Sequence, residues 1–423
     1  MADASLLDIL RRHWGHETFR GRQEEIVNAL ISGRDVAAVM PTGGGKSLCY
    51  QIPPVITKKL CLVVSPLIAL MRDQVAQLEE MGIPAAAINS AVSADEKRIA
   101  ARRALRGDLR LLYMSPERLM QDGVLDWLVR LNPGFFAIDE AHCISEWGHE
   151  FRPEYRQLKV LRERFPETPI AVFTASATRH VRQDIVRLLG LRDPLKYAQS
   201  FRRKNLRYFV REIESRDILP YLRAALRHYA GSVIVYAPTV LLVEELAIAL
   251  RAAGFPAASY HGQMEAAERE AQQEAWMSGR SPIMVGTLAF GLGINKPDVR
   301  AVIHLSLTKS LEQYYQESGR AGRDGHEADC ILLWQRANLR LLAHFIEQTE
   351  DEAERQRGWR RWRDIRKYAE TEECRQVVIC RHFGEEPKWG RCGCCDRCGF
   401  QPEWLEKALA LPSSRAKSRP RRR

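Results

Sequence analysis

The chain has 423 residues, with 64 Lys and Arg against 53 Asp and Glu, a formal net charge of +11. Its 45% hydrophobic and 28% charged residues exclude a disordered chain, a fibrous repeat and a small disulfide scaffold, and its length predicts two or three domains. No run approaches the roughly 18 apolar residues of a membrane span. The first ten residues lack the basic start and apolar run of a signal peptide. We therefore expect a cytoplasmic protein with reduced cysteines and no membrane contact.

Short β-rich apolar runs alternate with helical patterns over the first half of the chain. The runs lie at residues 36–40, 60–65, 111–114, 135–138 and 170–173. One helix is predicted over residues 65–81, with Ser65 as N-cap, Pro66 at the first helical position and Gly82 just past its end. Strands that alternate with helices in this way predict a parallel sheet wrapped by helices.

The alternation lapses over residues 192–207, which are polar and rich in arginine, and then begins again. Further apolar runs lie at residues 233–236, 283–285, 301–305 and 330–334, and a helix is predicted over residues 239–254. We therefore predict an α/β protein with two parallel-sheet domains in tandem, joined near residue 200. Beyond residue 336 the pattern is helical and rich in Arg and Trp, then rich in Cys. The last nine residues hold six basic side chains and no acidic one, which indicates a solvated tail or an attraction to phosphate.

A glycine-rich turn at residues 40–47 follows the first apolar run and precedes a short helical stretch at 48–52. Such a turn aims backbone N–H groups at phosphate. Gly43, Gly44 and Gly45, next to Thr42, permit a close approach of the backbone. Lys46 would reach the β- and γ-phosphates and the Ser47 hydroxyl would hold Mg²⁺. Met40 stands where the strict motif has glycine, and the alternative is a flexible turn; the strand-to-helix context favours nucleotide binding.

Two carboxylates follow the apolar run at residues 135–138. Asp139 can hold Mg²⁺, and Glu140 is placed to activate the attacking water as a general base. A lone Asp-Glu pair at the end of a strand is usually a solvated turn. Together with the loop at Lys46, the pair predicts hydrolysis of a nucleoside triphosphate.

Four cysteines near the C-terminus have the spacing of a metal site: Cys374, Cys392, Cys395 and Cys398. Four thiolates at these intervals can close a tetrahedral Zn²⁺ site, and a reducing compartment favours metal over disulfides. Cys380 and Cys394 raise the number of candidate ligands to six. Cys49, Cys61, Cys143 and Cys330 lie in or beside apolar runs and are expected to be core residues.

The motifs, taken in order, resemble those of a RecQ-type DNA helicase of helicase superfamily 2. The matching segments are residues 14–23, 40–47, 65–74, 114–119, 139–142, 174–178, 287–298 and 316–325, followed by the cysteines. Each segment alone is a weak or moderate signal, whereas the ordered series is specific. The resemblance implies two RecA-like domains followed by a small helical zinc-binding module, with ATP, Mg²⁺ and a structural Zn²⁺ held by the four cysteines named above.

The resemblance also implies roles for individual residues. Arg20 would pack on adenine and Gln23 would hydrogen-bond its edge, while His16 stands where the family often has tyrosine. His142 completes the Asp-Glu-Ala-His tetrad. Trp147, His149, Phe151 and Arg152 would form an aromatic-rich loop that binds DNA; the alternative, that the aromatic residues belong to the core, is disfavoured by the glycine and charges between them.

In the second domain the resemblance assigns Gln316, Arg320 and Arg323 to catalysis. The arginines would face the γ-phosphate and stabilise charge as it develops, although a basic surface turn is the alternative. Thr174, Ser176 and Thr178 would couple the domains, and Phe290, Asn295 and Lys296 would serve DNA contact and coupling. In the helical segment before the cysteines, Trp359 and Trp362 are expected to be buried, and its arginines either face solvent or contact the DNA backbone.

The sequence thus predicts an ATP-binding domain at 1–200, a second RecA-like domain at 201–335, a zinc-binding module at 336–400 and a basic tail at 401–423. We expect an ATP-dependent 3′–5′ DNA helicase or translocase in repair or recombination, acting on single-stranded and on tailed or branched duplex DNA. The 25 residues after Cys398 are too few for a winged helix, so a short form of the family is expected. The alternatives are an ATP-gated DNA-binding or strand-annealing protein and an RNA helicase. Protein partners cannot be read from the sequence.

Overall fold

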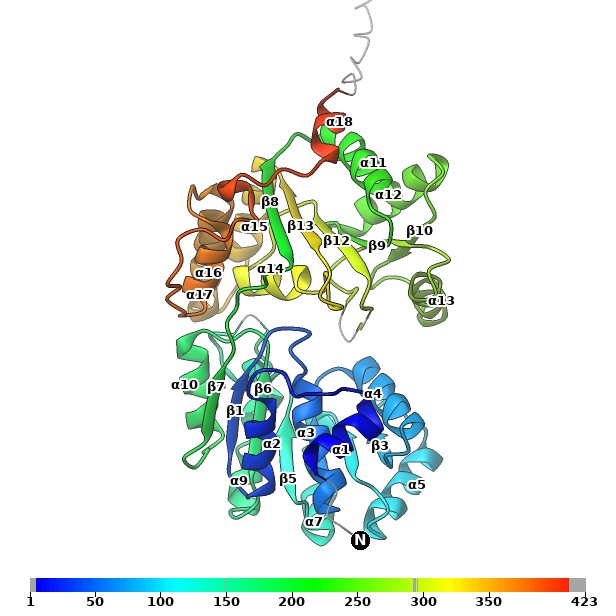
Figure 1. The fold of residues 1–423 in the computed structure, drawn as a ribbon, viewed down its shortest axis with the longest axis vertical. Coiled ribbons are helices and arrows are strands. Elements are labelled where there is room, and N and C mark those ends of the chain that lie inside the picture. Colours follow the sequence, from blue (N-terminus) through cyan, green and yellow to red (C-terminus); the bar gives the residue numbers. More distant parts are fainter. Residues whose placement is uncertain (1–4, 149, 292–293, 295, 411–423) are drawn as a thin grey trace, which may run out of the picture. The chain divides into compact units, whose positions relative to one another are not determined.

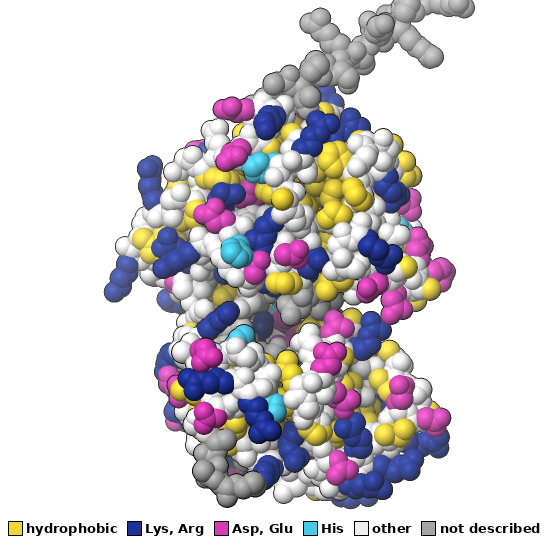
Figure 2. Space-filling view, turned by 45° about the vertical axis from the view of Figure 1, so that its right-hand side comes forward, with side chains coloured by type: hydrophobic (Ala, Val, Ile, Leu, Met, Phe, Trp, Pro, Cys, Tyr) yellow, Lys and Arg dark blue, Asp and Glu magenta, His cyan; other side chains and the backbone are white. Residues whose placement is uncertain are grey.

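The computed structural model describes residues 5–148, 150–291, 294 and 296–410, which form two compact units (Figure 1). Unit 1 contains the described residues up to Phe201, together with Ile294 and His382–Glu385. Unit 2 contains the other described residues from Arg202 onward. Basic and acidic side chains are interspersed over the visible face of each unit (Figure 2). Among the described residues, no helix combines the length and apolar character that crossing a membrane requires.

Unit 1 is built on a seven-stranded sheet in the order β3-β4-β2-β5-β6-β1-β7, in which every neighbouring pair is parallel. Its strands are β1 (Val36–Val39), β2 (Cys61–Val64), β3 (Ala85–Ile88), β4 (Leu111–Met114), β5 (Phe135–Ile138), β6 (Ile170–Thr174) and β7 (Leu195–Ala198). All residues of β2, β4 and β5 are buried because helices cover both faces of a parallel sheet, which is why these strands read as unbroken apolar runs.

The helices of unit 1 connect these strands. They are α1 (Leu6–Ile9), α2 (Gln23–Ile31), α3 (Lys46–Thr57), α4 (Ile68–Glu80), α5 (Ala94–Leu105), α6 (Pro116–Leu119), α7 (Val124–Leu131), α8 (Pro153–Gln157), α9 (Val160–Arg164) and α10 (Arg179–Leu188), with a short π-helix η1 (Leu10–Trp14) and a short 3-10 helix η2 (Ala141–Ile144). The sequence placed the start of α4 too early. Ser65 receives the N–H of Leu67 instead of capping a helix, and Leu67 is the extended N-cap residue.

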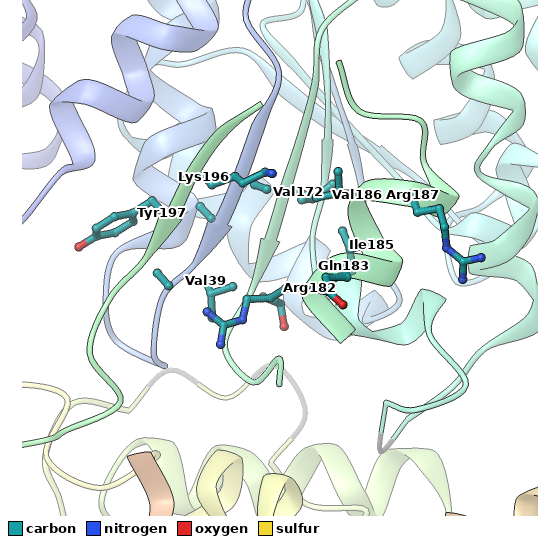
Figure 3. Close-up of a pocket in the computed structure, with 13 residues that line it drawn as sticks. Val39, Val172, Arg182, Gln183, Ile185, Val186, Arg187, Lys196 and Tyr197 are labelled. Carbon is teal, nitrogen blue, oxygen red and sulfur yellow. The ribbon is translucent and has the colours of Figure 1, made fainter. Parts of the chain in front are cut away.

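A cavity of about 420 Å³ lies in unit 1 where α10 faces β1, β6 and β7 (Figure 3). Its lining is mostly apolar and includes Ala37, Val172 and Ile185, with Arg182 and Lys196 among the charged residues. None of the predicted catalytic or nucleotide-binding residues lines it. The cavity is therefore separate from the loop at Lys46.

Unit 2 contains a six-stranded parallel sheet in the order β10-β11-β9-β12-β13-β8. Its strands are β8 (Leu206–Glu212), β9 (Ser232–Tyr236), β10 (Ala257–Tyr260), β11 (Ile283–Gly286), β12 (Val299–His304) and β13 (Ala328–Trp334). Its helices around the sheet are α11 (Ile218–His228), α12 (Val240–Ala252), α13 (Ala266–Met277) and α14 (Leu311–Ser318), and η3 (Ser215–Asp217) precedes α11. The main apolar core packs α11 and α12 on the sheet.

The C-terminal part adds α15 (Arg336–Glu347), α16 (Glu352–Glu370), α17 (Arg375–His382), η4 (Asp396–Cys398) and α18 (Trp404–Ala410). Trp359 and Trp362 of α16 are only half-buried, unlike the expected buried stripe, because α16 packs through Ile365 and Ala369 instead. The cysteine-rich segment covers the edge of β8, where the Tyr208 N–H donates to the Cys394 carbonyl at 3.1 Å. This contact protects an otherwise open sheet edge.

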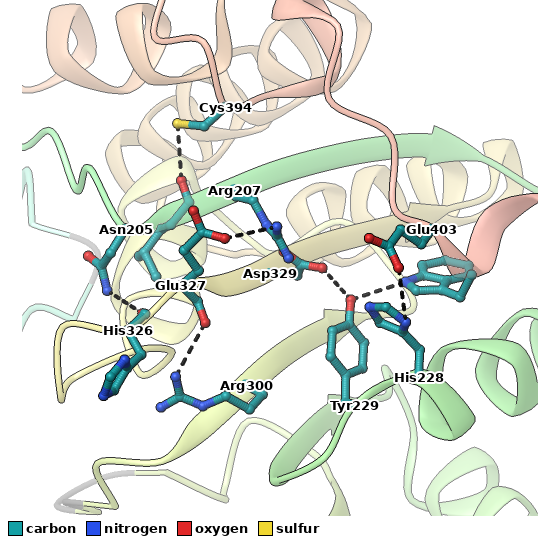
Figure 4. A network of polar contacts seen from close by, with 12 residues as sticks. Asn205, Arg207, His228, Tyr229, Arg300, His326, Glu327, Asp329, Cys394 and Glu403 are labelled. Atoms are coloured by element: carbon teal, nitrogen blue, oxygen red, sulfur yellow. Dashed lines mark hydrogen bonds and ion pairs between the residues drawn. The ribbon is translucent and has the colours of Figure 1, made fainter.

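A polar network fixes α18 to the same sheet (Figure 4). The Trp404 indole N–H donates to the Tyr229 hydroxyl at 3.0 Å, and that hydroxyl donates to Asp329. The other oxygen of Asp329 accepts from the Nε of Arg207 at 2.6 Å. Asp329 is thereby paired although it is buried in β13.

Candidate active site and metal centre

The loop between β1 and α3 offers backbone N–H groups as ligands. Gly43 and Gly45 have φ values of 80° and 78°, which glycine adopts without a Cβ penalty. Gly45 is the N-cap residue of α3, and no side chain caps this helix. A Cβ on Gly44 would lie 2.9 Å from the Pro41 carbonyl oxygen. The loop thus leaves the first N–H groups of α3 available to an anion.

Lys46 begins α3 and points toward the carboxylates that follow β5. Its Nζ lies 3.9 Å from Oε1 of Glu140, and its side chain is 14% exposed. Ser47 is half-buried on the first turn of the same helix, and Thr42 is half-buried in the loop. The structure therefore brings the predicted phosphate loop and the predicted carboxylate pair together in unit 1.

Gln23 holds the loop from the other side. Its Nε2 donates to the carbonyls of Gly44 and Gly45 at 3.2 Å each, and its Oε1 accepts from the Arg20 N–H at 2.8 Å. The side chains of Arg20 and His16 are exposed. The amide predicted to recognise adenine therefore also ties the N-terminal segment to the phosphate loop, a contact that sequence spacing could not reveal.

Asp139 is 4% exposed, and its Oδ1 accepts the Glu140 N–H at 3.0 Å. Its backbone carbonyl accepts from the Tyr155 hydroxyl at 2.9 Å. Burial, followed by the nearby Glu140 carboxylate, raises the pKa of Asp139 above its usual range, and Lys46 acts against this rise. A divalent cation beside Asp139 would favour the charged form in the same way as Lys46 does, so the donor set fits Mg²⁺.

Glu140 has a left-handed backbone, with φ 47° and ψ 42°. This conformation costs a residue with a Cβ on the order of 1–2 kcal/mol, and such strain often occurs at functional sites. The strained turn allows the chain to leave β5 abruptly and enter η2. As a result, Glu140 and His142 both lie next to the end of β5.

His142 is fully buried and connects Glu140 to β6. Its Nδ1 lies 3.0 Å from the Thr174 hydroxyl and 3.3 Å from Oε2 of Glu140. Burial lowers the pKa of this imidazole, but Cys143, Glu140 and Glu150 around it raise the pKa well above its usual value. Thr174 also accepts the Met40 N–H through its backbone carbonyl at 2.9 Å. A movement of His142 would therefore disturb both its contact with the Glu140 carboxylate and, through Thr174, the start of the phosphate loop at Met40.

Residues 145–148 and 150–152 lie in a loop between η2 and α8, as the sequence predicted. Trp147 is 39% exposed and meets His180 edge-on, with ring centroids 5.1 Å apart. Phe151 is half-buried beneath the guanidinium of Arg156, and the Arg152 N–H donates to the Cys143 carbonyl at 2.9 Å. His149 lies outside the described residues. The loop is thus anchored to η2 at its end and presents an indole to solvent.

In unit 2 the predicted catalytic residues lie at the end of α14 and in the turn after it. Gln316, Arg320 and Arg323 are all half-buried. Arg203 donates to the Gly319, Ala321 and Gly322 carbonyls at 3.2–3.4 Å, and Asn205 donates to Gly322 at 2.8 Å. These contacts give the turn a defined shape.

Two residues assigned to DNA contact and coupling are buried in unit 2. Phe290 is 1% exposed, and Lys296 donates from Nζ to the Met277 carbonyl at 2.9 Å. Asn295 lies outside the described residues. Phe290 and Lys296 thus stabilise the region after β11 from within.

The four predicted metal-ligating sulfurs all lie within 4.8 Å of one another. The Cys392–Cys398 and Cys374–Cys395 sulfur pairs are each 3.9 Å apart. Zn–S bonds of about 2.3 Å in a tetrahedron place sulfurs about 3.8 Å apart, so this donor set fits Zn²⁺. The Cys392 N–H points at the Cys374 sulfur at 3.3 Å, a contact that supports a thiolate. Cys380 is buried elsewhere and Cys394 is outside the cluster, which resolves the choice among six candidates.

Arg375 and Asp396 clamp the cluster together. The Nε and Nη2 of Arg375 donate to the two carboxylate oxygens at 2.9 and 2.8 Å, and Nη1 donates to the Tyr368 carbonyl. The guanidinium is completely buried.

The four cysteines assigned to the core, Cys49, Cys61, Cys143 and Cys330, are buried as expected.

The fold is similar to that of solved two-domain helicases. A DUF1998 helicase, MrfA, bound to DNA and AMPPNP is similar, with a TM-score of 0.64 and 18% identity over 79% of this chain and 51% of that one. Dbp5 of S. cerevisiae bound to RNA and ADP BeF3 has a TM-score of 0.62 and 19% identity over 87% of this chain and 92% of that one.

Family models give a finer assignment. Residues 20–185 match the DEAD/DEAH box helicase model, residues 215–325 the helicase conserved C-terminal domain and residues 336–399 the RecQ zinc-binding domain. The ATP-dependent DNA helicase RecQ of Haemophilus influenzae is 41% identical over 94% of this chain and 64% of that protein. The protein of the same name in Bacillus subtilis is 40% identical over 92% of this chain and 66% of that protein. The chain belongs to the RecQ-type helicases, and it spans just under two thirds of the length of these relatives.

Proposed function

We propose that the chain is an ATP- and Mg²⁺-dependent DNA helicase that moves 3′ to 5′ on single-stranded DNA and unwinds tailed or branched duplexes in repair or recombination. The observation that carries this proposal is the group formed by the uncapped helix α3, Lys46 and the Asp139–Glu140 pair in unit 1. The names of the RecQ relatives support DNA and ATP as substrates.

In this proposal the backbone of residues 43–46 and the Lys46 ammonium bind the phosphates, and Ser47 and Asp139 hold the cation. Mg²⁺ supplies charge neutralisation on the β- and γ-phosphates when bound. Glu140 accepts a proton from the attacking water. Arg320 and Arg323 stabilise the charge that develops on the transferred phosphoryl group. Gln23 and Arg20 bind the adenine, and the Lys46 ammonium lies 3.9 Å from Oε1 of Glu140.

DNA stimulation would act through the loop between η2 and α8 that carries Trp147 and Arg152. Trp147 offers a face on which an unpaired base can stack irrespective of its identity, a contact worth about 1–3 kcal/mol per base. Arg152 is available to a phosphate, and its N–H is bonded to the Cys143 carbonyl next to His142. A base bound at Trp147 can therefore shift His142 and, with it, Glu140.

The test combines ATP hydrolysis with strand displacement. We expect hydrolysis to rise with single-stranded DNA and not with single-stranded RNA, and strand separation to require a 3′ tail. Lys46→Ala should abolish nucleotide binding, whereas Glu140→Gln should bind ATP and lower kcat by roughly 10²–10⁴-fold, the usual contribution of a general base. Glu163→Gln, an exposed carboxylate on α9, is the matched control.

Each outcome has a defined meaning. Stimulation by RNA alone would replace DNA as the substrate. Robust hydrolysis without strand displacement would favour a DNA-binding or strand-annealing protein. Glu140→Gln hydrolysing as fast as Glu163→Gln would remove the proposed general base.

A further inference from the structure

Tyr236, the last residue of β9, is a buried tyrosine whose hydroxyl has a specific acceptor. The hydroxyl donates to the Phe290 carbonyl at 3.2 Å. Its ring stacks on His304, with centroids 5.0 Å apart and an interplanar angle of 27°. No motif assigned this residue a role, because a tyrosine at the end of an apolar strand reads as part of the core.

The acceptor of this hydrogen bond is itself fixed. The Phe290 ring meets Tyr260 and Trp276 edge-on, at centroid distances of 5.1 and 5.3 Å. The Phe290 N–H donates to the Thr287 carbonyl at 3.0 Å. Phe290 is therefore held at three groups: its ring by Tyr260 and Trp276, its N–H by Thr287, and its carbonyl by the Tyr236 hydroxyl.

The next carbonyl along the chain receives Arg320. Nη1 of Arg320 donates to the Gly291 oxygen. Gly291 has φ 118°, and a Cβ there would lie 2.7 Å from both the Arg320 guanidinium and the Tyr236 hydroxyl. Tyr236, Gly291 and Arg320 thus meet at one point, with no space for an additional carbon atom.

A second path joins Tyr236 to the same arginine. His304, on which Tyr236 stacks, contacts Oε2 of Glu317 through Nε2 at 2.7 Å. Glu317 lies in α14, three residues before Arg320, and its other oxygen accepts from Gln313 at 2.9 Å. The Nε of Arg320 is buried and has no hydrogen-bond partner among the described residues, so part of the guanidinium's hydrogen-bonding capacity is unused.

We propose that Tyr236 is a positioning residue for Arg320: its hydroxyl fixes the Phe290–Gly291 backbone on which the guanidinium rests, and its ring, through His304 and Glu317, supports the helix α14 that precedes Arg320. The inference rests on the proposed role of Arg320 in ATP hydrolysis. Catalysis requires a guanidinium to be preorganised, because a small displacement weakens its stabilisation of the transition state. The hydroxyl remains a donor throughout the working pH range, since burial raises the pKa of Tyr236 to about 12.

The deciding variant is Tyr236→Phe, which keeps the ring on His304 and removes only the hydroxyl. We expect kcat for DNA-stimulated ATP hydrolysis to fall roughly tenfold, the effect of one lost hydrogen bond passed fully to the transition state. The KM for ATP should change less than about twofold, because this contact does not bind the nucleotide. Tyr260→Phe is the matched control. It removes a phenolic hydroxyl beside the same Phe290 ring but leaves the Tyr236 hydrogen bond intact.

A double-mutant cycle separates positioning from a general loss of stability. In the Arg320→Ala background, Tyr236→Phe should lower kcat less than about twofold further, since the group that it positions is gone. Thermal unfolding of each variant, measured in parallel, checks that unit 2 is folded. A multiplicative effect of the two substitutions, or an unchanged kcat in Tyr236→Phe, would overturn the inference.

The same variants distinguish failure of the positioning role of Tyr236 from failure of the proposed function. If Arg320→Ala hydrolyses ATP at the wild-type rate, Arg320 has no role in catalysis and the inference falls with it. If Arg320→Ala is slow and Tyr236→Phe is not, only the positioning role is lost. A rise in DNA-independent hydrolysis in Tyr236→Phe would also overturn it, because the Gly291 contact would then restrain Arg320 instead of preparing it.

Discussion

The turns that follow β1 in unit 1 and β9 in unit 2 both connect a strand to a helix. They differ in whether a side chain caps the start of that helix. The turn after β1 ends in Gly45, and no side chain caps α3. The turn after β9 ends in Thr239, whose hydroxyl accepts the Leu242 N–H at 3.2 Å and caps α12. One helix start is left to a ligand, while the other is satisfied by its own side chain.

The contrast shows that a parallel sheet alone does not make a phosphate site. A helix start can bind an anion where the turn before it leaves the first N–H groups without a side-chain partner. Unit 2 uses side chains for the opposite purpose: Arg203 and Asn205 bond the carbonyls of the turn that follows α14, and four cysteine sulfurs gather within 4.8 Å of one another. Unit 1 therefore exposes backbone donors to a ligand, whereas unit 2 uses side chains to fix its own backbone.

The largest effect is expected where a side-chain ligand of unit 2 is removed. Cys395 is fully buried, and its sulfur lies 3.9 Å from that of Cys374. Cys395→Ala should release zinc and unfold the segment around residues 374–398, a loss on the order of 5 kcal/mol or more given the binding energies of structural zinc. Zinc content and limited proteolysis measure it. Cys394→Ala, one residue away and outside the cluster, should keep its zinc; equal zinc loss in both variants would contradict the assignment.

A smaller loss is expected from the ion pair beside the cluster. Asp396→Ala leaves the completely buried Arg375 guanidinium without its carboxylate, which should lower the free energy of unfolding by about 3–5 kcal/mol. Chemical denaturation measures the change. Asp396→Asn retains one acceptor and should lose less. A loss below about 1 kcal/mol for Asp396→Ala would show that the zinc ligands alone hold this module.

In unit 1, adding a Cβ to a glycine of the turn after β1 should lower nucleotide affinity more than it lowers the stability of the protein. Gly45→Ala forces a Cβ into the Gln23 amide at a residue with φ 78°. We expect ATP affinity to fall about 100-fold, or about 2.7 kcal/mol, in a nucleotide titration. Gly33→Ala is the matched control, because its φ of 84° carries a similar backbone penalty and nothing lies within 4 Å of the added carbon. Equal affinities for the two variants would contradict a role for the open turn.

The sequence predicted the centre of each sheet far better than its edges. The nine runs that it identified correspond to strands flanked on both sides, such as β5 and β9. None of the four edge strands, β3, β7, β8 and β10, was among them. Ala85–Ile88 and Ala257–Tyr260 are rich in alanine, a poor strand former, and Leu195–Ala198 lies in the stretch where the alternation seemed to lapse. An edge strand forms because it pairs with a neighbouring strand, and that pairing cannot be read from the residues of the edge strand alone.

The site divides in the same way between local and distant information. Lys46, Asp139 and Glu140 could be predicted because each follows a strong apolar run, and parallel strands end at the same edge of a sheet. The hydrogen bonds from Gln23 to the phosphate loop and from Tyr236 to Phe290 could not be predicted. Each joins two segments whose distance in space cannot be read from the sequence. The positive φ of Glu140 also has no sequence signal, since glutamate rarely adopts it.

The smallest predicted effect tests the other half of the comparison between the two turns. Thr239→Ala removes the side-chain cap of α12 and should lower the stability of the protein by about 1 kcal/mol, as cap removal commonly does. Thr239→Ser keeps the hydroxyl and should restore most of that loss. Neither substitution should alter the KM for ATP, because the first N–H groups of α12 serve only the fold. A tenfold change in KM with unchanged stability would mean that this helix start also meets a ligand, and the division between a backbone that binds and a side chain that caps would not hold.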